Sequence, residues 1–397
     1  MNRSKPINSL LKASMAVMLL GIGCGPPPET QMSPPAPSQA DLFVSGENGY
    51  HTYRIPALIV TRQGSLLAFC EGRKNNRRDH GDIDLLIKRS TDGGQTWSDQ
   101  QIVYEEGGTE EITIGNPCPV VDQETGTIWL PFCRDNKEVL VTKSIDDGVT
   151  WSDPVDITAD VKKPDWTWVA TGPGIGIQLE HEPYKGRLVI PCDHGKGSGE
   201  EGDERVQYSH VMYSDDHGET WQLGAAVAPH TDECQVIEKD DGTLLINMRN
   251  YWGRQGGRPE RGSMRALATS QDGGATWSEL SFDQTLIEPM CQASLIRHVG
   301  HGAAESPSRL LFSNPASRTD RVDLTVRLSS DSGKTWPVSR LLNPGRSAYS
   351  NLAILPDGSI GCLYERGKSI PYETITFARL TMDWLIGGTE IFAPDRR

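Results

Sequence analysis

The chain has little positive charge for its size. Among its 397 residues, 39 Lys and Arg stand against 53 Asp and Glu, which gives a formal net charge of −14. This balance argues against non-specific binding to nucleic acid or to anionic membrane surfaces. Long stretches rich in Ala, Glu, Lys and Leu are scarce, whereas there are 41 Gly, 26 Pro and 10 Trp. The composition therefore favours an all-β fold.

The sequence also lacks a C-x-x-C motif, so we expect neither a zinc ribbon nor a dithiol redox site. An odd number of cysteines, seven, follows Cys24, and Cys70, Cys133, Cys192 and Cys362 stand inside apolar runs. Such positions are typical of buried thiols that pack as small hydrophobic side chains. One or two disulfides in an oxidising compartment remain an alternative.

Residues 1–24 resemble a secretory signal. Arg3, Lys5 and Lys12 precede an apolar stretch at residues 13–22, which is too short to span a bilayer as a helix. Gly23-Cys24 is similar to a bacterial lipoprotein cleavage site, although Leu stands four residues before the Cys rather than three. We predict a secreted, periplasmic or cell-surface protein with a lipid anchor at Cys24; ordinary secretion is the alternative. Residues 25–40 hold six Pro and are predicted to form an extended linker.

An octet with the pattern S-x-D-x-G-x-T-W recurs five times, beginning at Ser90, Ser144, Ser214, Ser270 and Ser329. Its copies are about 60 residues apart, which indicates an internal structural repeat. In a hairpin turn, Asp accepts backbone N–H groups, Gly supplies a positive φ and Trp covers the turn. We therefore predict a structural role, and no catalysis, for the five Asp residues.

A second repeat, a turn residue followed by an apolar strand, lies between the octets. Its six copies begin at Gly64, Gly126, Gly186, Gly242, Ser308 and Gly358. Further β-rich runs follow at residues 83–90, 138–144, 206–214, 265–270 and 324–329. Four antiparallel strands in each of six units predict a six-bladed β-propeller over residues 41–397.

Charged residues follow the strands of the second repeat, where equivalent strand ends converge on one mouth of a propeller channel. Arg occurs after five of the six strands, at Arg73, Arg134, Arg249, Arg318 to Arg321, and Arg366. The planar guanidinium holds a carboxylate bidentately, which Lys cannot do. On an acidic protein this pattern predicts a pocket that holds a small anion by short-range contacts.

Several motifs together resemble those of the bacterial exo-α-sialidases, or neuraminidases. They are the five octets, known as Asp boxes or BNR repeats, with Tyr53-Arg54-Ile55-Pro56, Asn116-Pro117-Cys118-Pro119, Thr171-Gly172-Pro173-Gly174, Glu233-Cys234-Gln235, Met248-Arg249-Asn250 and Ala348-Tyr349-Ser350. The resemblance covers essentially all of residues 41–380. It implies a retaining glycoside hydrolase that removes terminal sialic acid from glycoproteins, glycolipids and oligosaccharides, without a metal or organic cofactor.

The resemblance also implies roles for single residues. Arg54, Arg249 and Arg321 would clamp the sialic acid carboxylate, Glu365 would support Arg54, and Arg73 would face the 4-position of the ring. Arg321 is preferred to Arg318 because it directly precedes the next strand. The alternative for Arg54 is a strand-end salt bridge. The alternative for Glu365 is a plain carboxylate at the rim of the pocket. Asp193 and His194 replace aromatic residues found there in some relatives, which leaves the glycerol and N-acyl contacts open.

Tyr349 is implied as the nucleophile, with Glu233 as its base. Sialic acid carries a carboxylate on its anomeric carbon, so a carboxylate nucleophile would meet like charge, whereas a neutral phenol avoids this and needs a base. Nearby Arg side chains are expected to favour the phenolate. Asp79, six residues after Arg73, is implied as the acid/base; Asp82 is the alternative.

Three other functions compete with hydrolysis. The same site would serve transfer of sialic acid to another sugar, a non-catalytic propeller that binds an anionic ligand, or hydrolysis of a different acidic sugar. Retention of Tyr349, Glu233 and Asp79 argues against a pure binding protein, which needs only the Arg set. We expect a monomer, because no heptad or amphipathic helix suggests an assembly.

Overall fold

The computed structural model describes residues 35–298 and 309–387. The predicted signal segment, Cys24 and most of the predicted linker lie outside the described residues. The fold belongs to the unit that starts at Pro34. β1 (Ser38–Val44) begins within the last three residues of the predicted linker. None of the helices in the described part of the chain is long and apolar enough to cross a membrane.

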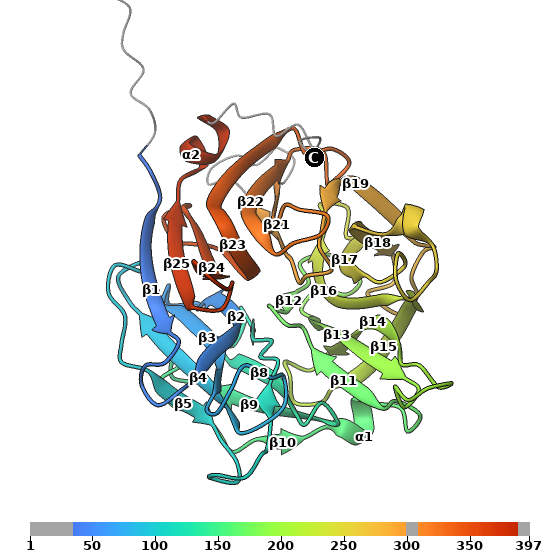
Figure 1. Cartoon of the computed structure of the whole chain (residues 1–397), viewed down its shortest axis with the longest axis horizontal. Helices are drawn as coiled ribbons and strands as arrows, with labels where there is room; N and C mark the ends of the chain where they lie inside the picture. Colours follow the sequence, from blue (N-terminus) through green and yellow to red (C-terminus); the bar gives the residue numbers. More distant parts are fainter. Residues whose placement is uncertain (1–34, 299–308, 388–397) are drawn as a thin grey trace, which may run out of the picture. The chain divides into compact units, whose positions relative to one another are not determined.

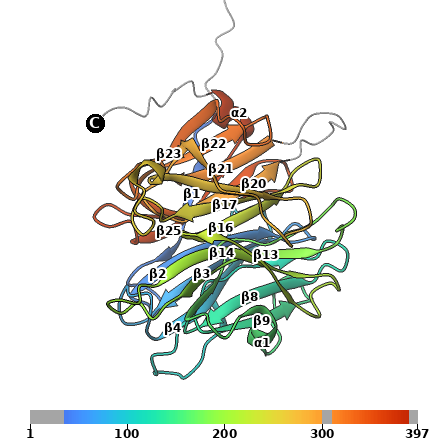
Figure 2. The same cartoon turned by 90° about the vertical axis from the view of Figure 1, so that its right-hand side faces the viewer.

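The strands form five antiparallel sheets, arranged around a centre (Figures 1 and 2). The first has the order β2-β3-β4-β5 and contains β2 (Thr52–Val60), β3 (Leu66–Arg73), β4 (Ile83–Ser90) and β5 (Gln101–Tyr104). The second contains β6 (Ile114–Gly115), β7 (Val120–Val121), β8 (Ile128–Arg134), β9 (Glu138–Ser144) and β10 (Val155–Asp156). The short helix α1 (Thr158–Val161) follows it.

The third and fourth sheets continue the same pattern. The third contains β11 (Trp168–Thr171), β12 (Ile177–Gln178), β13 (Leu188–Lys196), β14 (Val206–Ser214) and β15 (Gln222–Pro229). The fourth contains β16 (Thr231–Glu238), β17 (Leu244–Asn250), β18 (Met264–Ser270) and β19 (Ser281–Ile287), with the 3-10 helix η1 (Pro259–Arg261) between β17 and β18.

The fifth sheet has seven strands in the order β1-β25-β24-β23-β22-β21-β20. It contains β20 (Ser294–His298), β21 (Arg309–Pro315), β22 (Val322–Ser329), β23 (Val338–Ile354), β24 (Ile360–Arg366) and β25 (Thr374–Leu380), and α2 (Met382–Gly387) follows. β1 pairs with β25, with Ser38 opposite Arg379, so the first strand completes the last sheet. The predicted all-β, propeller-like chain is confirmed. The described strands are nevertheless joined in five sheets rather than six, because β23 pairs with both β22 and β24.

The apolar core lies between neighbouring sheets. On β3, Leu66, Ala68 and Cys70 pack with Phe377 of the fifth sheet. Leu67 and Phe69 point the other way and pack with Phe132 and other residues of the second sheet. Because successive side chains of a strand alternate between its faces, a strand covered on both faces is apolar throughout. All seven cysteines that the structure describes are free and buried, as predicted for most of them.

The five octets are turns with one hydrogen-bond pattern, as predicted. In the second copy, Asp146 accepts the backbone N–H of Thr150 at 2.9 Å and its hydroxyl at 2.6 Å. The Ser144 hydroxyl donates to Asp146 at 2.8 Å and accepts the N–H of Gly148 at 2.9 Å. Equivalent Asp–Thr bonds occur at Asp92, Asp216, Asp272 and Asp331.

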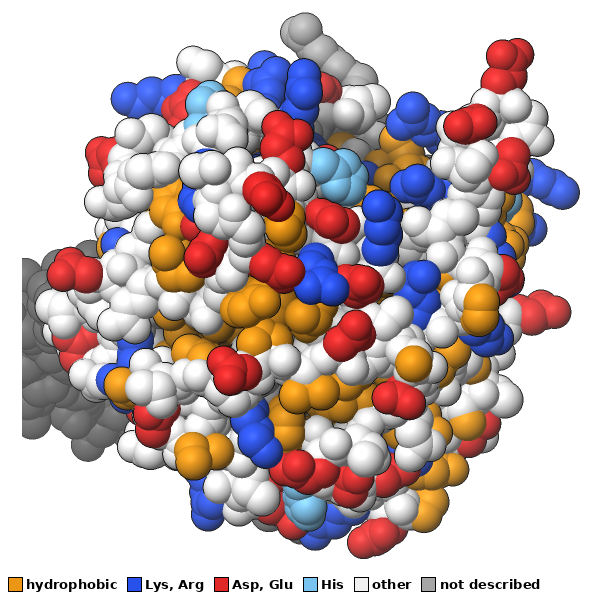
Figure 3. All heavy atoms as spheres, turned by 90° about the horizontal axis from the view of Figure 1, so that it is seen from below, with side chains coloured by type: hydrophobic (Ala, Val, Ile, Leu, Met, Phe, Trp, Pro, Cys, Tyr) orange, Lys and Arg blue, Asp and Glu red, His pale blue; other side chains and the backbone are white. Residues whose placement is uncertain are grey.

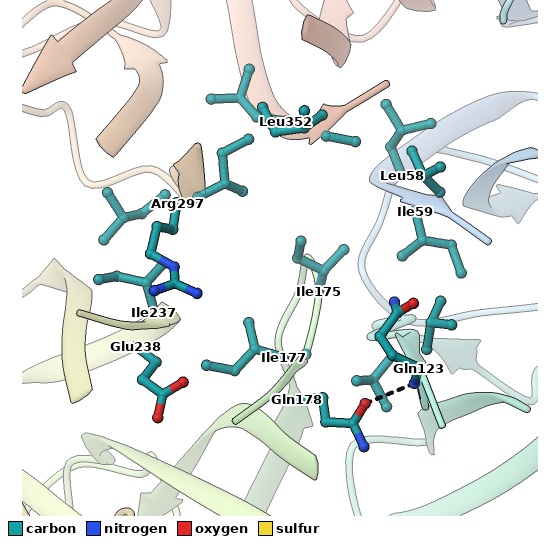
Figure 4. Close-up of a pocket in the computed structure, with 18 of the residues that line it drawn as sticks. Leu58, Ile59, Gln123, Ile175, Ile177, Gln178, Ile237, Glu238, Arg297 and Leu352 are labelled. Atoms are coloured by element: carbon teal, nitrogen blue, oxygen red, sulfur yellow. Dashed lines mark hydrogen bonds between the residues drawn. The ribbon is translucent and has the colours of Figure 1, made fainter. Parts of the chain in front are cut away.

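The innermost strands leave a hollow at each of their ends. β2, β16 and β23 run from a polar pocket, which Arg54, Glu233 and Tyr349 line, to a second cavity of about 280 Å³. Figure 4 shows that aliphatic side chains such as Leu58 and Ile237 line this cavity together with Glu238 and Arg297. Seen from below, acidic and basic side chains are interspersed over the surface, with apolar side chains between them (Figure 3).

Candidate active site

A polar pocket of about 250 Å³ gathers nearly all the site residues expected from the sequence. Its lining includes Arg54, Arg73, Asp79, Glu233, Arg249, Arg321 and Tyr349. The eighth expected residue, Glu365, is fully buried behind Arg54. The structure thus places these eight residues together, while their roles in a reaction stay predictions.

Three strands carry a β-bulge at the pocket. Register shifts lie between Arg54 and Ala57 in β2, between Thr231 and Cys234 in β16, and between Ser347 and Ser350 in β23. A bulge inserts a residue and turns side chains away from the regular ladder. In β2 the shift falls on Ile55, whose φ is 62°, before a proline that has no N–H to pair. The Arg-Ile-Pro motif is therefore the sequence of a bulge.

The Tyr349 hydroxyl donates a hydrogen bond to Glu233 Oε1. Arg249 Nη1 contacts both groups, at 2.7 Å from Glu233 Oε2 and 3.2 Å from Tyr349 Oη. The Arg249 guanidinium completes this three-residue cluster. Its buried positive charge is paired with the Glu233 carboxylate. A tyrosine hydroxyl bonded to a carboxylate is the arrangement that an activated nucleophile requires.

Arg54 and Arg321 both lie close to the ring of Tyr349. Their guanidinium carbons are 4.8 and 5.3 Å from the centroid of the Tyr349 ring. Arg321 Nη1 donates to the hydroxyl of Tyr372 at 2.9 Å, and the Arg54 guanidinium lies 4.1 Å from the Tyr372 ring centroid. Three cations thus surround one phenol, a site that favours an anion.

Arg73 and Asp79 form another part of the pocket lining. Arg73 Nη1 donates to Asp79 Oδ1 at 2.7 Å, and Arg54 Nη1 lies 3.5 Å from the same oxygen. Glu71 accepts from Arg73 Nη2 at 2.6 Å and fixes this guanidinium. The Asp79 side chain is 70% exposed, so it reaches the solvent side of the pocket.

The comparisons with known proteins decide the family. A family profile described as a BNR repeat-like domain matches residues 64–362. A sialidase from Micromonospora viridifaciens is 36% identical over 97% of this chain and 61% of its own length. An exo-alpha-sialidase from Aspergillus fumigatus is 31% identical over 86% of each chain. The chain belongs to the sialidase family.

The structure comparison agrees with this membership. A Hadza microbial sialidase matches with a TM-score of 0.76 and 33% identity, over 88% of this chain and 69% of the other. The predicted resemblance is therefore confirmed. The chain spans about three fifths of the length of the bacterial sialidases from Micromonospora viridifaciens and Bacteroides fragilis, at 61% and 63%.

In this member of the sialidase family, burial raises the pKa of Tyr349 well above its ordinary value, and the Glu233 carboxylate adds to the effect. The charges of Arg249, Arg321 and Arg54 act in the opposite direction but do not outweigh burial. The arginines thus favour the phenolate, as expected, but burial and Glu233 outweigh them and the neutral phenol prevails. The Tyr349 hydroxyl therefore keeps its proton and donates it in the hydrogen bond to Glu233 Oε1.

Asp79 has a pKa below its ordinary value. Burial raises the pKa, but attraction to Arg73 and Arg54 and the hydrogen bond from Arg73 outweigh it. In the unliganded site Asp79 is thus the partner of two arginines. A bound carboxylate that engages Arg54 would remove part of this attraction and favour the protonated acid.

Two alternatives from the sequence lie outside the pocket lining. Arg318 is exposed and contacts the carbonyl of Ser263 at 3.4 Å, whereas Arg321 lines the pocket. Asp82 is buried and pairs with Lys74 Nζ at 3.1 Å. Asp79 is therefore the only one of these two acids that lines the pocket.

The expectation that Arg from five strand ends converges on one pocket is wrong for two of them. Arg134 pairs with Glu106 at 3.0 Å and with Glu138. Arg366 pairs with Asp41 of β1 at 2.8 Å. Neighbouring residues of a strand point to opposite faces, so Arg366 points away from the face on which Glu365 contacts Arg54.

The sequence reasoning missed several lining residues. They are Glu71, Trp168, Gln207, Asp232 and Tyr251, with Tyr372 beside Arg54 and Arg321. Glu71 could have been predicted from the sequence, because it stands two residues before Arg73 and a buried arginine needs a carboxylate partner. Tyr372, Trp168 and Gln207 lie in segments without a repeat or motif, so only the folded chain brings them here.

Proposed function

We propose that this protein is an exo-α-sialidase that hydrolyses terminal α-linked sialic acids with retention of configuration. One observation carries the proposal: Tyr349 donates a hydrogen bond to Glu233 in a pocket that also holds Arg54, Arg249 and Arg321. Sialylated glycoproteins, glycolipids and oligosaccharides are the proposed substrates. The curated relatives named sialidase or exo-alpha-sialidase support this assignment.

In the first step, the three arginines hold the sugar carboxylate, and Tyr349 Oη bonds to the anomeric carbon as its proton passes to Glu233 Oε1. The bond from the anomeric carbon to the leaving oxygen breaks, and Asp79 gives that oxygen its proton. In the second step, Asp79 takes a proton from water, and the water oxygen bonds to the anomeric carbon. The bond to Tyr349 breaks, and Glu233 returns the proton to its oxygen. Two inversions retain the configuration.

We also infer the wider organisation of the protein. β23 pairs with β22 through Val338 to Arg346 and with β24 through Ser347 to Ile354, so its two halves would serve two blades and give six in all. Residues 1–24 would direct export, with a lipid anchor at Cys24 on a periplasmic or cell-surface protein, and the working state would be a monomer. Replacement of Cys24 by Ser, followed by membrane fractionation, tests the anchor.

The test of function measures release of the aglycone from an aryl α-sialoside by wild type and by Tyr349→Phe. Loss of the nucleophile should lower kcat by about 10³-fold or more. Tyr364→Phe is the matched control, because Tyr364 is fully buried and its hydroxyl has no hydrogen-bond partner among the described residues. Tyr364→Phe should therefore keep wild-type turnover.

Three results would overturn the proposal. Equal turnover by wild type and Tyr349→Phe would exclude this nucleophile. Binding of sialic acid without any release would indicate a binding propeller, and absence of binding would indicate another acidic sugar. Nuclear magnetic resonance of the first released sugar reports retention, and added galactoside acceptors separate hydrolysis from transfer.

A further inference from the structure

Asp79, the proposed acid, stands on the loop of residues 74–82, which joins β3 to β4. Its carboxylate accepts a hydrogen bond from Arg73 Nη1 at 2.7 Å and lies 3.5 Å from Arg54 Nη1. These ion pairs depend on an ionised Asp79, whereas the proposed first step requires the protonated acid. A substrate carboxylate at Arg54 would weaken the second pair as well. The position of the acid at that step therefore depends on contacts of the loop backbone.

Two contacts hold the loop backbone, one on each side of Asp79. Two residues before it, the carbonyl of Arg77 accepts a hydrogen bond from Arg73 Nη1 at 2.8 Å. Two residues after it, the N–H of Gly81 donates to Thr113 Oγ1 at 3.0 Å, and the same hydroxyl donates to the carbonyl of Gly81 at 3.0 Å. A hydroxyl both donates and accepts, so one side chain satisfies both backbone groups of the glycine. We call this pair of hydrogen bonds the Thr113 latch.

The second sheet holds Thr113 in place. Thr113 is 3% exposed and directly precedes β6. Its N–H donates to Asp135 Oδ1 at 2.9 Å, and its carbonyl accepts the N–H of Asp135 at 2.8 Å. A parallel bridge pairs Thr113 with Ile83, the first residue of β4. The Thr113 latch thus ties the loop of the first sheet to the sheet beside it.

The backbone of Gly81 has a conformation that favours glycine. Its φ is 149°, which residues with a side chain rarely adopt. A Cβ at Gly81 would have none of the described atoms within 4 Å, so a substitution here would strain the backbone without a clash. The Thr113 latch can therefore be disturbed from either side, by a change at Thr113 or by one at Gly81.

We propose that Thr113 is a positioning residue for the acid/base, an inference that rests on the proposed function. Thr113 lies outside the lining of the pocket and would act only through the loop, by fixing Gly81 and thereby the place of the Asp79 carboxyl group. Protonation of Asp79 removes the charge that attracts it to the arginines, so the anchored backbone sets where its proton meets the glycosidic oxygen. A misplacement of about 1 Å in such a group can cost about 100-fold in rate.

The test compares wild type with Thr113→Val, which keeps the shape of the side chain and removes the hydroxyl. One substrate is a sialyl-oligosaccharide, whose leaving group the acid has to protonate, and the other is an aryl α-sialoside with an activated leaving group, which does not need the acid. The ratio kcat/KM reports the steps up to departure of the leaving group. For Thr113→Val it should fall about 10–100-fold on the oligosaccharide and stay within about threefold of wild type on the aryl sialoside.

Three further variants separate the Thr113 latch from the general stability of the fold. Thr113→Ser keeps the hydroxyl and should restore most of the rate, and Gly81→Ala should reproduce the selective loss. Thr142→Val is the matched control, because Thr142 is 1% exposed on β9 of the same sheet and its hydroxyl donates to the carbonyl of Ser152 at 2.6 Å. Thr142→Val should leave the ratio of the two rates unchanged, and thermal unfolding of each variant reports the fold.

A double-mutant cycle shows whether Thr113 acts through Asp79. In Asp79→Asn the acid is already absent, so the addition of Thr113→Val should change kcat/KM on the oligosaccharide by about twofold or less. A further loss of about tenfold in the double variant would overturn the proposal. Equal losses on both substrates in Thr113→Val would overturn it too.

If wild type hydrolyses neither substrate, amide hydrogen exchange read by mass spectrometry replaces the rates. Peptides that cover residues 74–82 should exchange faster in Thr113→Val than in wild type, and Thr142→Val should leave their exchange unchanged. Faster exchange would support the Thr113 latch while the proposed hydrolysis fails, and equal exchange in all three proteins would overturn it.

Discussion

Glu365 accepts hydrogen bonds from Nε and Nη2 of Arg54, at 2.9 and 3.2 Å, although 311 residues separate the two in the sequence. The same carboxylate accepts the backbone N–H groups of Ile55 at 2.9 Å and of Tyr349 at 3.1 Å. One buried side chain thus orients an arginine of the pocket and holds the bulge that carries the proposed nucleophile. We therefore expect Glu365 to position Arg54 and Tyr349 without contacting the substrate itself.

Replacement of Glu365 by Ala should destabilise the protein strongly. Arg54 would keep its buried charge without its buried partner, and loss of one member of such a pair costs about 3–5 kcal/mol. Urea unfolding gives the change in free energy. Initial rates on an aryl α-sialoside should show a raised KM, since the Arg54 fork is no longer fixed, and Glu365→Gln should restore part of both quantities.

Glu106→Ala is the matched control for this variant. Glu106 also pairs with an arginine, Arg134 at 3.0 Å, but both side chains are 30% exposed. A pair of that exposure contributes about 1 kcal/mol or less. If Glu365→Ala costs no more than Glu106→Ala and leaves KM unchanged, the positioning role is wrong.

The repeats made most of the fold predictable. Strands β4, β9 and β14 span residues 83–90, 138–144 and 206–214, as expected from the β-rich runs before each octet. The pairing of β1 with β25 was not predictable, because β1 carries no copy of either repeat and its partner is 335 positions away at Asp41–Thr376. The fifth sheet is continuous because β23 is long enough to pair with both β22 and β24. No sequence motif indicates this length.

The motifs predicted eight residues that the structure brings together, and three of them, Arg54, Glu233 and Tyr349, lie at bulges. At Arg54 the following Ile55-Pro56 explains the break in the ladder, because proline has no N–H to pair, whereas the bulge at Tyr349 has no comparable sequence signal. Arg134 was mistaken for a pocket residue because strand ends alone do not give the direction of a side chain. Asp193 is paired with Ser209, and Gln207 with Gly195, in a register between β13 and β14 that the sequence alone does not reveal.

The Asp box turns should matter for stability and not for turnover. Asp146→Ala removes two hydrogen bonds from Thr150 to a carboxylate. Each such bond to a charged group is worth about 1.5–3 kcal/mol, and solvent exposure reduces this value, so we expect a total loss of about 2 kcal/mol. Asp153→Ala, an exposed neighbour, is the control. A loss of kcat in correctly folded Asp146→Ala protein would contradict the structural role.

Asp79 should show different pH limits in the free enzyme and in the substrate complex. Attraction to Arg73 and Arg54 outweighs the effect of burial and lowers its pKa in the unliganded site. The acid must be protonated for the first step, so activity falls as pH rises above its pKa. Because the substrate carboxylate engages Arg54, the pKa should rise in the complex. The alkaline limb of kcat should therefore lie at higher pH than that of kcat/KM.

Rates are measured across the pH range on a sialyl-oligosaccharide, whose leaving group has to be protonated by the acid. The pH dependences of kcat and of kcat/KM then give the two alkaline limbs. Asp79→Asn should abolish the alkaline limb and lower kcat by about 10²–10⁴-fold. The kcat of Asp79→Asn on an aryl sialoside with an activated leaving group should fall much less. Coincident limbs in wild type would show that the substrate does not draw Arg54 away from Asp79.

His194 and His210 should make the protein less stable as pH falls. Both are 1% exposed and their Nδ1 atoms are 3.1 Å apart, an arrangement in which one ring donates and the other accepts. Burial lowers the pKa of His194 to about 3, with Lys196 acting in the same direction and Asp165 opposing it. Burial and then His194 lower the pKa of His210.

A histidine whose pKa is lowered by folding stabilises the native state fully above its unfolded pKa, and this stability is lost as pH falls from about 6.5 toward the folded value. Each histidine should remove about 1.4 kcal/mol per pH unit in that window. Urea unfolding of wild type and His194→Gln at pH 7.5 and 4.5 isolates one of them, because the difference between the two proteins should shrink at the lower pH. His51→Gln, at an exposed histidine, is the control. A difference that stays constant with pH would show that His194 takes up its proton equally in the folded and unfolded chain.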